Sequence, residues 1–245
     1  MPPERLAGPL DKRQTEVGRM FDLITPTYDR LNGVMSLGLD RRWREIGLEQ
    51  LQAARTDLVL DVATGTGDMA DGAGRIYGCP VVGLDLSRNM LNVALDKNRQ
   101  MGREGTYILV RGDALAMPFR DGVFDRVVVA FGIRNMPSVD AFLGEVGRVL
   151  RPGGRLVMVE LSQPSNPVLR FISSTYLTKL LPLIATLQGG DATAYRYLSA
   201  SIISFPNPSQ IERMVEDRGL GLERSRSLSL GACHLYVAVK ESVPR

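Results

Sequence analysis

The sequence contains little of what several common kinds of site require. Among its 245 residues are two cysteines, Cys79 and Cys233, and one histidine, His234. The cysteines lack CxxC spacing and are too few for a disulfide framework, so we expect no metal site and a reducing compartment. His234 has no evident catalytic partner in the sequence, and we expect it to serve the structure rather than the chemistry.

Long runs of like charge or of hydrophobic residues are also missing. The net charge is +3, but basic and acidic residues are interspersed, which gives no support for a nucleic-acid partner and leaves a mild attraction to anionic membranes open. The first ten residues lack the apolar core of a signal peptide, which predicts a cytoplasmic protein. The most apolar long window, 168–187, contains Arg170, Lys179 and Pro182 and should not span a bilayer.

A glycine turn follows the first predicted strand. The apolar run 58–60 ends on Asp61, and Gly65 and Gly67 follow, where a helix should begin. Glycine tolerates positive φ and lets a ligand approach the first NH groups of a helix. The turn suits a nucleotide or an anion, although the same spacing occurs in dinucleotide-binding proteins and in plain strand-to-helix turns.

From residue 57 onward, predicted strands and helices alternate, as in a parallel sheet with helices on both faces. The second strand ends on Asp85, which is placed to accept the ribose hydroxyls of a nucleoside. Asp113 follows the third strand, either as an adenine contact or as an ordinary loop carboxylate. Ligands bind beyond the carboxyl ends of such strands, so one crevice should collect five side chains: Asp61, Asp85, Asp113, Arg134 and Asn135.

Helix boundaries can be read from caps and breakers. Ser87 should cap a helix that carries Met90, Leu91, Ala94 and Leu95 inward. A later helix should start at Ser138 and stop at the Arg151-Pro152-Gly153-Gly154 turn, with the fifth strand over 155–161.

Two segments lie outside this predicted core. Residues 1–55 should form an N-terminal helical extension, in which Trp43 and its neighbouring arginines either pack on the core or rest on lipid headgroups. Residues 162–206 are far longer than a crossover needs and should form either an apolar lid over the crevice or a bundle that packs the domain. With 56–161 as the cofactor-binding core and 207–245 as its last helix and strands, we expect one domain, 1–245.

This layout is similar to that of class I S-adenosylmethionine-dependent methyltransferases. Three motifs narrow the resemblance to the quinone-biosynthesis C-methyltransferases, the family that makes menaquinone and ubiquinone. They are Tyr28-Asp29-Arg30-Leu31-Asn32 near the front, Phe131-Gly132-Ile133-Arg134-Asn135 after the fourth strand, and Tyr195-Arg196-Tyr197-Leu198 with Ser201 in the long insertion. The resemblance extends from about Lys12 to Lys240 and covers nearly the whole chain.

The resemblance implies a seven-stranded, mostly parallel, Rossmann-like α/β sheet and S-adenosylmethionine as the cofactor. Ala130 stands where many relatives carry a serine, so a contact there would come from its backbone. The residues implied in cofactor binding are Asp61, Gly65, Thr66, Gly67, Asp85, Asp113, Ala114 and Ala130.

The implied reaction is C-methylation of a reduced, prenylated quinol, either demethylmenaquinol or a benzoquinol of ubiquinone synthesis. Arg134 would orient a water or stabilise the phenolate, with Tyr28 and Asn135 as the other catalytic residues. The implied substrate contacts are Tyr28, Asn32, Arg134, Tyr195, Tyr197 and Ser201.

The same resemblance bears on partners. The long insertion would cover the first prenyl units while the rest of the tail stays in the membrane, so we expect peripheral membrane contact and no nucleic acid. A homodimer is left open. The alternatives are a methyltransferase for another small apolar acceptor and a nucleoside-binding subunit without catalysis.

Overall fold

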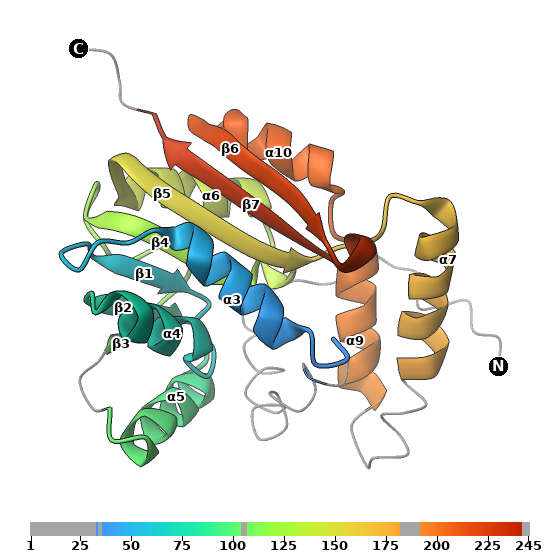
Figure 1. The fold of residues 1–245 in the computed structure, drawn as a ribbon, viewed down its shortest axis with the longest axis horizontal. Coiled ribbons are helices and arrows are strands. Elements are labelled where there is room, and N and C mark those ends of the chain that lie inside the picture. Colours follow the sequence, from blue (N-terminus) through green and yellow to red (C-terminus); the bar gives the residue numbers. More distant parts are fainter. Residues whose placement is uncertain (1–32, 34–35, 104–106, 182–191, 242–245) are drawn as a thin grey trace.

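A seven-stranded sheet forms the centre of the computed structural model, which describes Gly33 and residues 36–103, 107–181 and 192–241. The strands follow the order β3-β2-β1-β4-β5-β7-β6 (Figure 1). The order reverses between β1 and β4, and in open α/β sheets such a reversal creates a ligand crevice beyond the carboxyl ends of the strands. The mostly parallel sheet expected from the sequence is confirmed. Its strands are β1 (Val59–Val62), β2 (Val81–Asp85), β3 (Tyr107–Arg111), β4 (Phe124–Ala130), β5 (Leu150–Leu161), β6 (Leu220–Leu228) and β7 (Cys233–Lys240).

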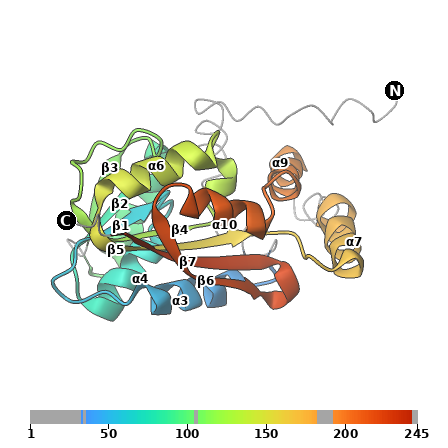
Figure 2. The same ribbon diagram turned by 90° about the horizontal axis from the view of Figure 1, so that it is seen from above.

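Strands β1 to β5 are parallel, whereas β7 runs antiparallel to both β5 and β6. Helices cover both faces of the sheet (Figure 2). On one face α3 (Asp40–Leu51) and α4 (Asp68–Tyr77) bury Val59 and Val128, and on the other α6 (Val139–Val149) and α10 (Pro208–Glu216) bury Leu60 and Val127. Neighbouring strand residues therefore serve opposite cores, because side chains alternate along a strand.

The predicted helix starts are largely confirmed. Ser87 accepts the NH of Met90 at the start of α5 (Arg88–Gln100), and Ser138 accepts the NH of Ala141 at the start of α6. One inward residue was predicted wrongly: Leu95 is 41% exposed. It follows Ala94 by one residue, a rotation of about 100° around the helix that turns it away from the buried stripe.

The end of α6 also differs from the expectation. The helix stops at Val149, and residues 150–154, predicted as the end of the helix and a turn, form the first part of β5. Leu150 pairs with Phe124 of β4, and the register shifts before Arg126 pairs with Arg155. A β-bulge at this point accommodates the Pro-Gly-Gly sequence within a strand.

Of the elements in the N-terminal extension, α3 falls within the described residues, whereas residues 1–32, 34 and 35 lie outside them. Trp43 packs on the core: it is 3% exposed and donates its indole NH to the Ser229 hydroxyl at 2.9 Å. Of the two readings of this cluster, the packed one is confirmed for Trp43.

The long insertion after β5 contains α7 (Pro167–Thr175), a π-helical turn (Tyr176–Leu180) and α9 (Ala192–Ile203). In both views α7 and α9 lie side by side beyond the end of β5 (Figures 1 and 2). Leu177 and Leu198 join the hydrophobic core beneath α3 and α4. The insertion is thus packed to the core at the end of the sheet where the crevice opens.

Candidate active site

The turn after β1 adopts the backbone conformations that its glycines permit. Gly65 and Gly67 have φ angles of 57° and 87°. A Cβ atom on Gly67 would lie 2.7 Å from the Tyr107 hydroxyl oxygen, closer than real Cβ atoms approach. Glycine is therefore needed at position 67 both for its backbone angle and for the space that Tyr107 occupies.

Asp85 connects the end of β2 to this turn. One carboxylate oxygen accepts the NH of Gly65 and the other accepts the NH of Ser87, each at 2.8 Å. These two bonds fix the orientation of the carboxylate beside the turn. The expected role of Asp85 toward ribose hydroxyls remains a prediction.

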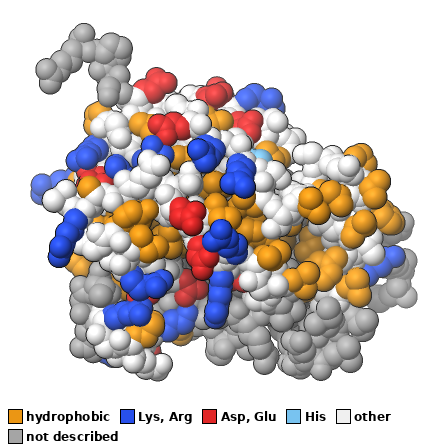
Figure 3. All heavy atoms as spheres, viewed as in Figure 1, with side chains coloured by type: hydrophobic (Ala, Val, Ile, Leu, Met, Phe, Trp, Pro, Cys, Tyr) orange, Lys and Arg blue, Asp and Glu red, His pale blue; other side chains and the backbone are white. Residues whose placement is uncertain are grey.

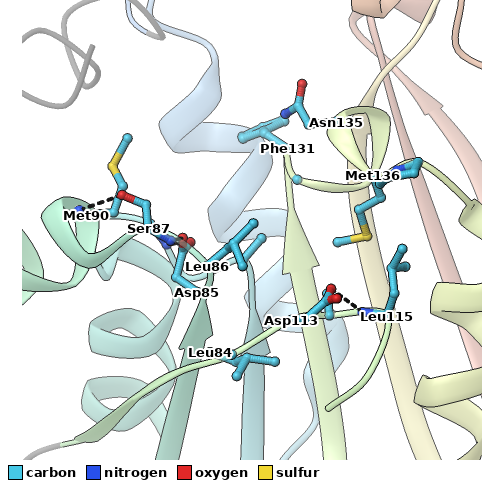
Figure 4. Close-up of a pocket in the computed structure, with 16 residues that line it drawn as sticks. Leu84, Asp85, Leu86, Ser87, Met90, Asp113, Leu115, Phe131, Asn135 and Met136 are labelled. Carbon is cyan, nitrogen blue, oxygen red and sulfur yellow. Dashed lines mark hydrogen bonds between the residues drawn. The ribbon is translucent and has the colours of Figure 1, made fainter. Parts of the chain in front are cut away.

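A pocket with a volume of about 780 Å³, including its open mouth, lies beside this turn. Figure 4 shows Asp85 and Ser87 on one side and Met136 and Leu115 on the other, with Phe131 and Asn135 near the top. The mixture of apolar walls with a few polar groups is typical of sites for small organic ligands.

Of the five side chains expected in the crevice, Asp85, Asp113 and Asn135 line this pocket, whereas Asp61 and Arg134 do not. The predicted cofactor contacts Gly65 and Ala114 line it as well. Asp113 is held by the NH of Leu115, which donates to its carboxylate at 2.8 Å. It is half-buried rather than an ordinary exposed loop carboxylate. Its position supports the adenine-side prediction.

Four predicted cofactor contacts do not line the pocket: Asp61, Thr66, Gly67 and Ala130. Thr66 faces the other side of the turn, where its hydroxyl accepts from the Lys97 ammonium at 2.9 Å. Ala130 packs against the core cluster that contains Trp43. In the described structure these residues lie outside the pocket lining, and their binding roles remain predictions.

Asp61 lies beneath the turn and is 1% exposed. The Thr64 hydroxyl donates to its carboxylate at 2.6 Å. Burial raises the pKa of Asp61 to about 7, and the Thr64 hydrogen bond opposes this rise. The glycine turn thus rests on a carboxyl group that titrates near neutral pH.

Phe131 is a pocket residue that the sequence did not single out as one. It follows β4 with a φ of 60°, and the Arg44 guanidinium lies 4.9 Å from the centre of its ring. Arg44 is in turn paired with Asp40 at 2.5 Å. The basic cluster of α3 therefore supports the wall of the pocket, a contact between segments far apart in the chain that sequence periodicity does not reveal.

Arg134 is fully buried directly behind the pocket residues Phe131 and Asn135. Its Nη1 donates to Glu160 Oε1 at 2.8 Å, and its backbone NH donates to Glu160 Oε2 at 3.1 Å. Its Nε and Nη2 have no hydrogen-bond partner among the residues that the structure describes. Glu160 lies in the predicted fifth strand, 155–161, and the sequence assigns it no role.

Two further buried polar atoms near Arg134 have no partner in the described part of the chain, the Tyr197 hydroxyl and Asn135 Oδ1. Burial raises the pKa of the Tyr197 phenol, and the positive charge of Arg134 partly offsets this rise. Tyr197 therefore keeps its proton near neutral pH and can donate it to a ligand oxygen. The structure thus brings Arg134, Asn135 and Tyr197 to one region, as the sequence predicted.

The other predicted substrate residues are placed differently. Ser201 is fully buried and donates its hydroxyl to the Leu198 carbonyl at 2.8 Å, a bond within α9. Tyr28, Asn32 and the side chain of Tyr195 lie outside the described residues. His234 contacts the Ser225 hydroxyl at 2.7 Å and stacks on Tyr236, away from the pocket; burial lowers its pKa.

Comparison with known proteins identifies the family. The model of the ubiE/COQ5 methyltransferase family matches residues 10–240. The chain belongs to this family. A "Ubiquinone/menaquinone biosynthesis C-methyltransferase UbiE" of Syntrophotalea carbinolica is 41% identical over 89% of this chain and 91% of its own. A "Demethylmenaquinone methyltransferase" of Bacteroides fragilis is 36% identical over 94% of each.

Solved structures confirm the class I methyltransferase fold. Geranyl diphosphate C-methyltransferase from Streptomyces coelicolor, solved with geranyl diphosphate and S-adenosyl-L-homocysteine, has a TM-score of 0.61, with 17% identity over 82% of this chain and 79% of its own. At that identity the likeness shows the fold alone. In the described parts of this chain, no helix has the length and hydropathy needed to cross a bilayer.

Proposed function

We propose that this methyltransferase moves a methyl group from S-adenosylmethionine to a ring carbon of demethylmenaquinol and so forms menaquinol. The observation that carries the proposal is the buried Arg134, whose Nε and Nη2 have no hydrogen-bond partner among the described residues and whose sequence neighbour Asn135 lines the pocket. The names of the relatives favour the naphthoquinol, since both include menaquinone chemistry. A benzoquinol of ubiquinone synthesis is the second candidate because one of those names includes it.

The pocket residues suit S-adenosylmethionine. Asp85 is held in place at the end of β2 for ribose hydroxyls, Asp113 and Ala114 line the adenine side, and Gly65 lets the ligand approach the turn. At Gly132 a Cβ atom would lie 2.6 Å from the Ala63 Cβ, so the two pocket segments approach as closely as glycine allows. S-adenosylmethionine supplies a sulfonium methyl group, which bonds to the ring carbon as its carbon–sulfur bond breaks.

Arg134 is suited to the acceptor side of the reaction. A quinol that loses a hydroxyl proton gains electron density on the neighbouring ring carbon, and that carbon attacks the methyl group; its hydrogen then leaves as a proton and the ring becomes aromatic again. The Nε and Nη2 groups of Arg134 stabilise the negative oxygen, and one such donor in an enzyme is worth about 10²–10³ in rate. Tyr197 and Asn135 hold the ring, and alignment of the two carbons contributes on the order of 7–11 kcal/mol.

The insertion supplies the route for the prenyl tail. We assign residues 162–206 to a cover over the acceptor site. The whole chain, 1–245, then forms one domain, in which 1–55 are a helical extension, 56–161 the cofactor-binding core and 207–245 the last helix and strands. This assignment is supported by the packing of Leu177 and Leu198 on the core and by the position of α7 and α9 beyond the end of β5. Each prenyl methylene buried there is worth about 0.8 kcal/mol.

Peripheral membrane contact is part of the proposal. Val168, Phe171 and Ile172 form an exposed apolar face of α7, which we call the α7 face, and Figure 3 shows hydrophobic side chains gathered over this part of the molecule. Residues 161–190 contain no Asp or Glu but include Arg170 and Lys179, so the α7 face is complementary to an anionic bilayer surface. We place the protein in the cytoplasm, at the membrane that holds the quinol. A homodimer remains a prediction that sedimentation of the purified protein tests.

The direct test is methyl transfer. Purified protein is incubated with S-adenosylmethionine and chemically reduced demethylmenaquinone in detergent, and the mass of the quinone is then measured by mass spectrometry. We expect one added methyl group on the reduced naphthoquinol and none on the oxidised form, because only the reduced ring is nucleophilic. Binding of S-adenosylmethionine without methylation of either naphthoquinol or benzoquinol would contradict the quinol assignment.

A further inference from the structure

Glu160 accepts three hydrogen bonds at the end of β5. Its Oε1 accepts Arg134 Nη1 and the NH of Leu161, each at 2.8 Å, and its Oε2 accepts the backbone NH of Arg134 at 3.1 Å. Both side chains are buried, with exposures of 0% and 1%. The carboxylate therefore fixes the guanidinium from one side and the backbone of the same arginine from another.

These contacts determine which edge of the Arg134 guanidinium remains available for a ligand. Nη1 is used by Glu160 and by the Phe131 carbonyl, which accepts it at 2.5 Å. In an arginine, the NH bonds of Nε and Nη2 point the same way from one edge and form the fork that binds paired or single oxygen anions. Glu160 and Phe131 therefore leave the whole fork available, and none of the described residues occupies it.

We propose that Glu160 is the positioning residue of the reaction, which presents the Arg134 fork to the ionised oxygen of the acceptor and limits its net charge. This inference rests on the proposed function. Glu160 touches no reacting atom, so it acts through Arg134. The Glu160 carboxylate offsets the positive charge of the Arg134 guanidinium. The fork therefore binds anions less tightly, and an acceptor that still carries its hydroxyl proton can occupy the site.

A role in stability alone does not account for this arrangement. Buried ion pairs often contribute less than apolar residues of similar volume would, because desolvation offsets their attraction. A purely structural pair would also be expected to satisfy all its polar atoms, whereas this one leaves Nε and Nη2 without a partner in the described chain. The incomplete bonding points to a ligand oxygen.

Glu160→Gln tests the proposal, since an amide has one accepting oxygen where the carboxylate has two. We expect kcat to fall about 10- to 100-fold, which is the loss typical when the hydrogen-bond partner of a metal-binding side chain is removed. The Kd for S-adenosylhomocysteine should be unchanged. We also expect a shift in the pH profile of kcat/KM. Without the Glu160 charge, Arg134 lowers the pKa of the acceptor hydroxyl. The rising limb of the kcat/KM profile therefore shifts to lower pH by about one pH unit.

Glu160→Asp is the more conservative substitution at the same position. It keeps the charge and both oxygens but shortens the side chain, so we expect a lowered kcat with the pH limb at its wild-type position. The control is Glu223→Gln, which removes a carboxylate bound to Arg155 at 2.8 Å on the far strand β6 and should leave kcat and the limb unchanged.

A Glu160→Gln variant that loses activity equally at every pH, or that keeps wild-type kcat, overturns the positioning role. Should that variant fail to fold, Glu160→Asp decides, and wild-type kcat in it overturns the role as well. Wild-type protein that binds S-adenosylhomocysteine but methylates no quinol refutes the proposed function instead, so the two failures are distinguishable.

Discussion

Asp61 accepts a hydrogen bond from the Thr64 hydroxyl at 2.6 Å beneath the glycine turn. Burial is the main cause that raises the pKa of Asp61, from 3.8 to about 7, and the nearby Asp85 carboxylate adds to it. Between these two values the folded protein holds a proton on Asp61 that the unfolded chain releases. The associated stability is therefore present in full below about pH 4 and is lost as the pH rises through 7.

Asp61→Asn should remove this dependence, because the amide does not ionise and its oxygen can still accept from Thr64. We expect the free energy of unfolding of the wild type to fall as the pH rises from 5 to 7, at up to about 1.4 kcal/mol per unit from this group, and the fall to be smaller in the variant. Urea unfolding at pH 5, 6, 7 and 8 measures both slopes. Asp96→Asn, an exposed carboxylate on α5, is the control, and equal slopes in Asp61→Asn and wild type would contradict the prediction.

Part of the sheet could be predicted from the sequence, because the first two strands are apolar runs that end at or next to an aspartate. Asp61 and Asp85 were placed within one or two residues of the strand ends for this reason. The start of β5 could not be predicted in this way, because proline and glycine, as at Pro152 and Gly153, usually occur in turns. Pairing with β4 outweighs that local preference here.

The site could be predicted only in part. Asp85, Asp113 and Asn135 follow directly from the rule that ligands bind at the carboxyl ends of parallel strands. The partnership of Arg134 with Glu160 depends on the register of β4 and β5, which pairs Ala130 with Val159 and sets the next residues side by side. Register is a tertiary property that a one-residue slip would change, so the sequence singles out Arg134 but not its partner Glu160.

Gly67 is predicted to be among the least replaceable glycines. Gly67→Ala forces a Cβ atom within 2.7 Å of the Tyr107 hydroxyl at a φ of 87°, and we expect a loss of about 2–4 kcal/mol from backbone strain and overpacking together. Gly102 has a similar positive φ but no atom near its Cβ position, so Gly102→Ala should cost only about 1 kcal/mol. Denaturant unfolding of both variants separates the two effects, and equal losses would exclude the Tyr107 contact as a cause.

Asp85→Asn should weaken the cofactor complex. The amide has one accepting oxygen and no charge, so it cannot hold the NH groups of both Gly65 and Ser87 and also receive ribose hydroxyls. A hydrogen bond to a charged group is worth about 1.5–3 kcal/mol, so we expect the Kd for S-adenosylhomocysteine to rise at least tenfold by calorimetry. Asp113→Asn is the informative comparison, because it changes the adenine side of the same pocket. A Kd for Asp85→Asn equal to that of the wild type would remove Asp85 from the ribose site.

The α7 face is predicted to hold the protein on anionic membranes. Phe171 and Ile172 are 74% and 58% exposed, and burial of a large apolar side chain contributes about 1.5–3 kcal/mol. Replacing both with Glu removes that gain and adds repulsion from anionic lipid. We therefore expect binding to vesicles that contain an anionic phospholipid to fall at least tenfold in a flotation assay, and wild-type binding to weaken as salt is added.

The matched control for the α7 face is Ile76→Glu, because Ile76 is 52% exposed on α4, a helix on one face of the sheet. It adds a negative charge at a similarly exposed apolar position, one charge against the two of the α7 variant, and should leave vesicle binding unchanged. Activity on a short-chain quinol dispersed in detergent should survive in the α7 variant, because the acceptor ring is held by Arg134 and its neighbours rather than by α7. Retained vesicle binding in the α7 variant would move the membrane contact elsewhere, and lost activity in detergent would instead show that α7 shapes the acceptor site itself.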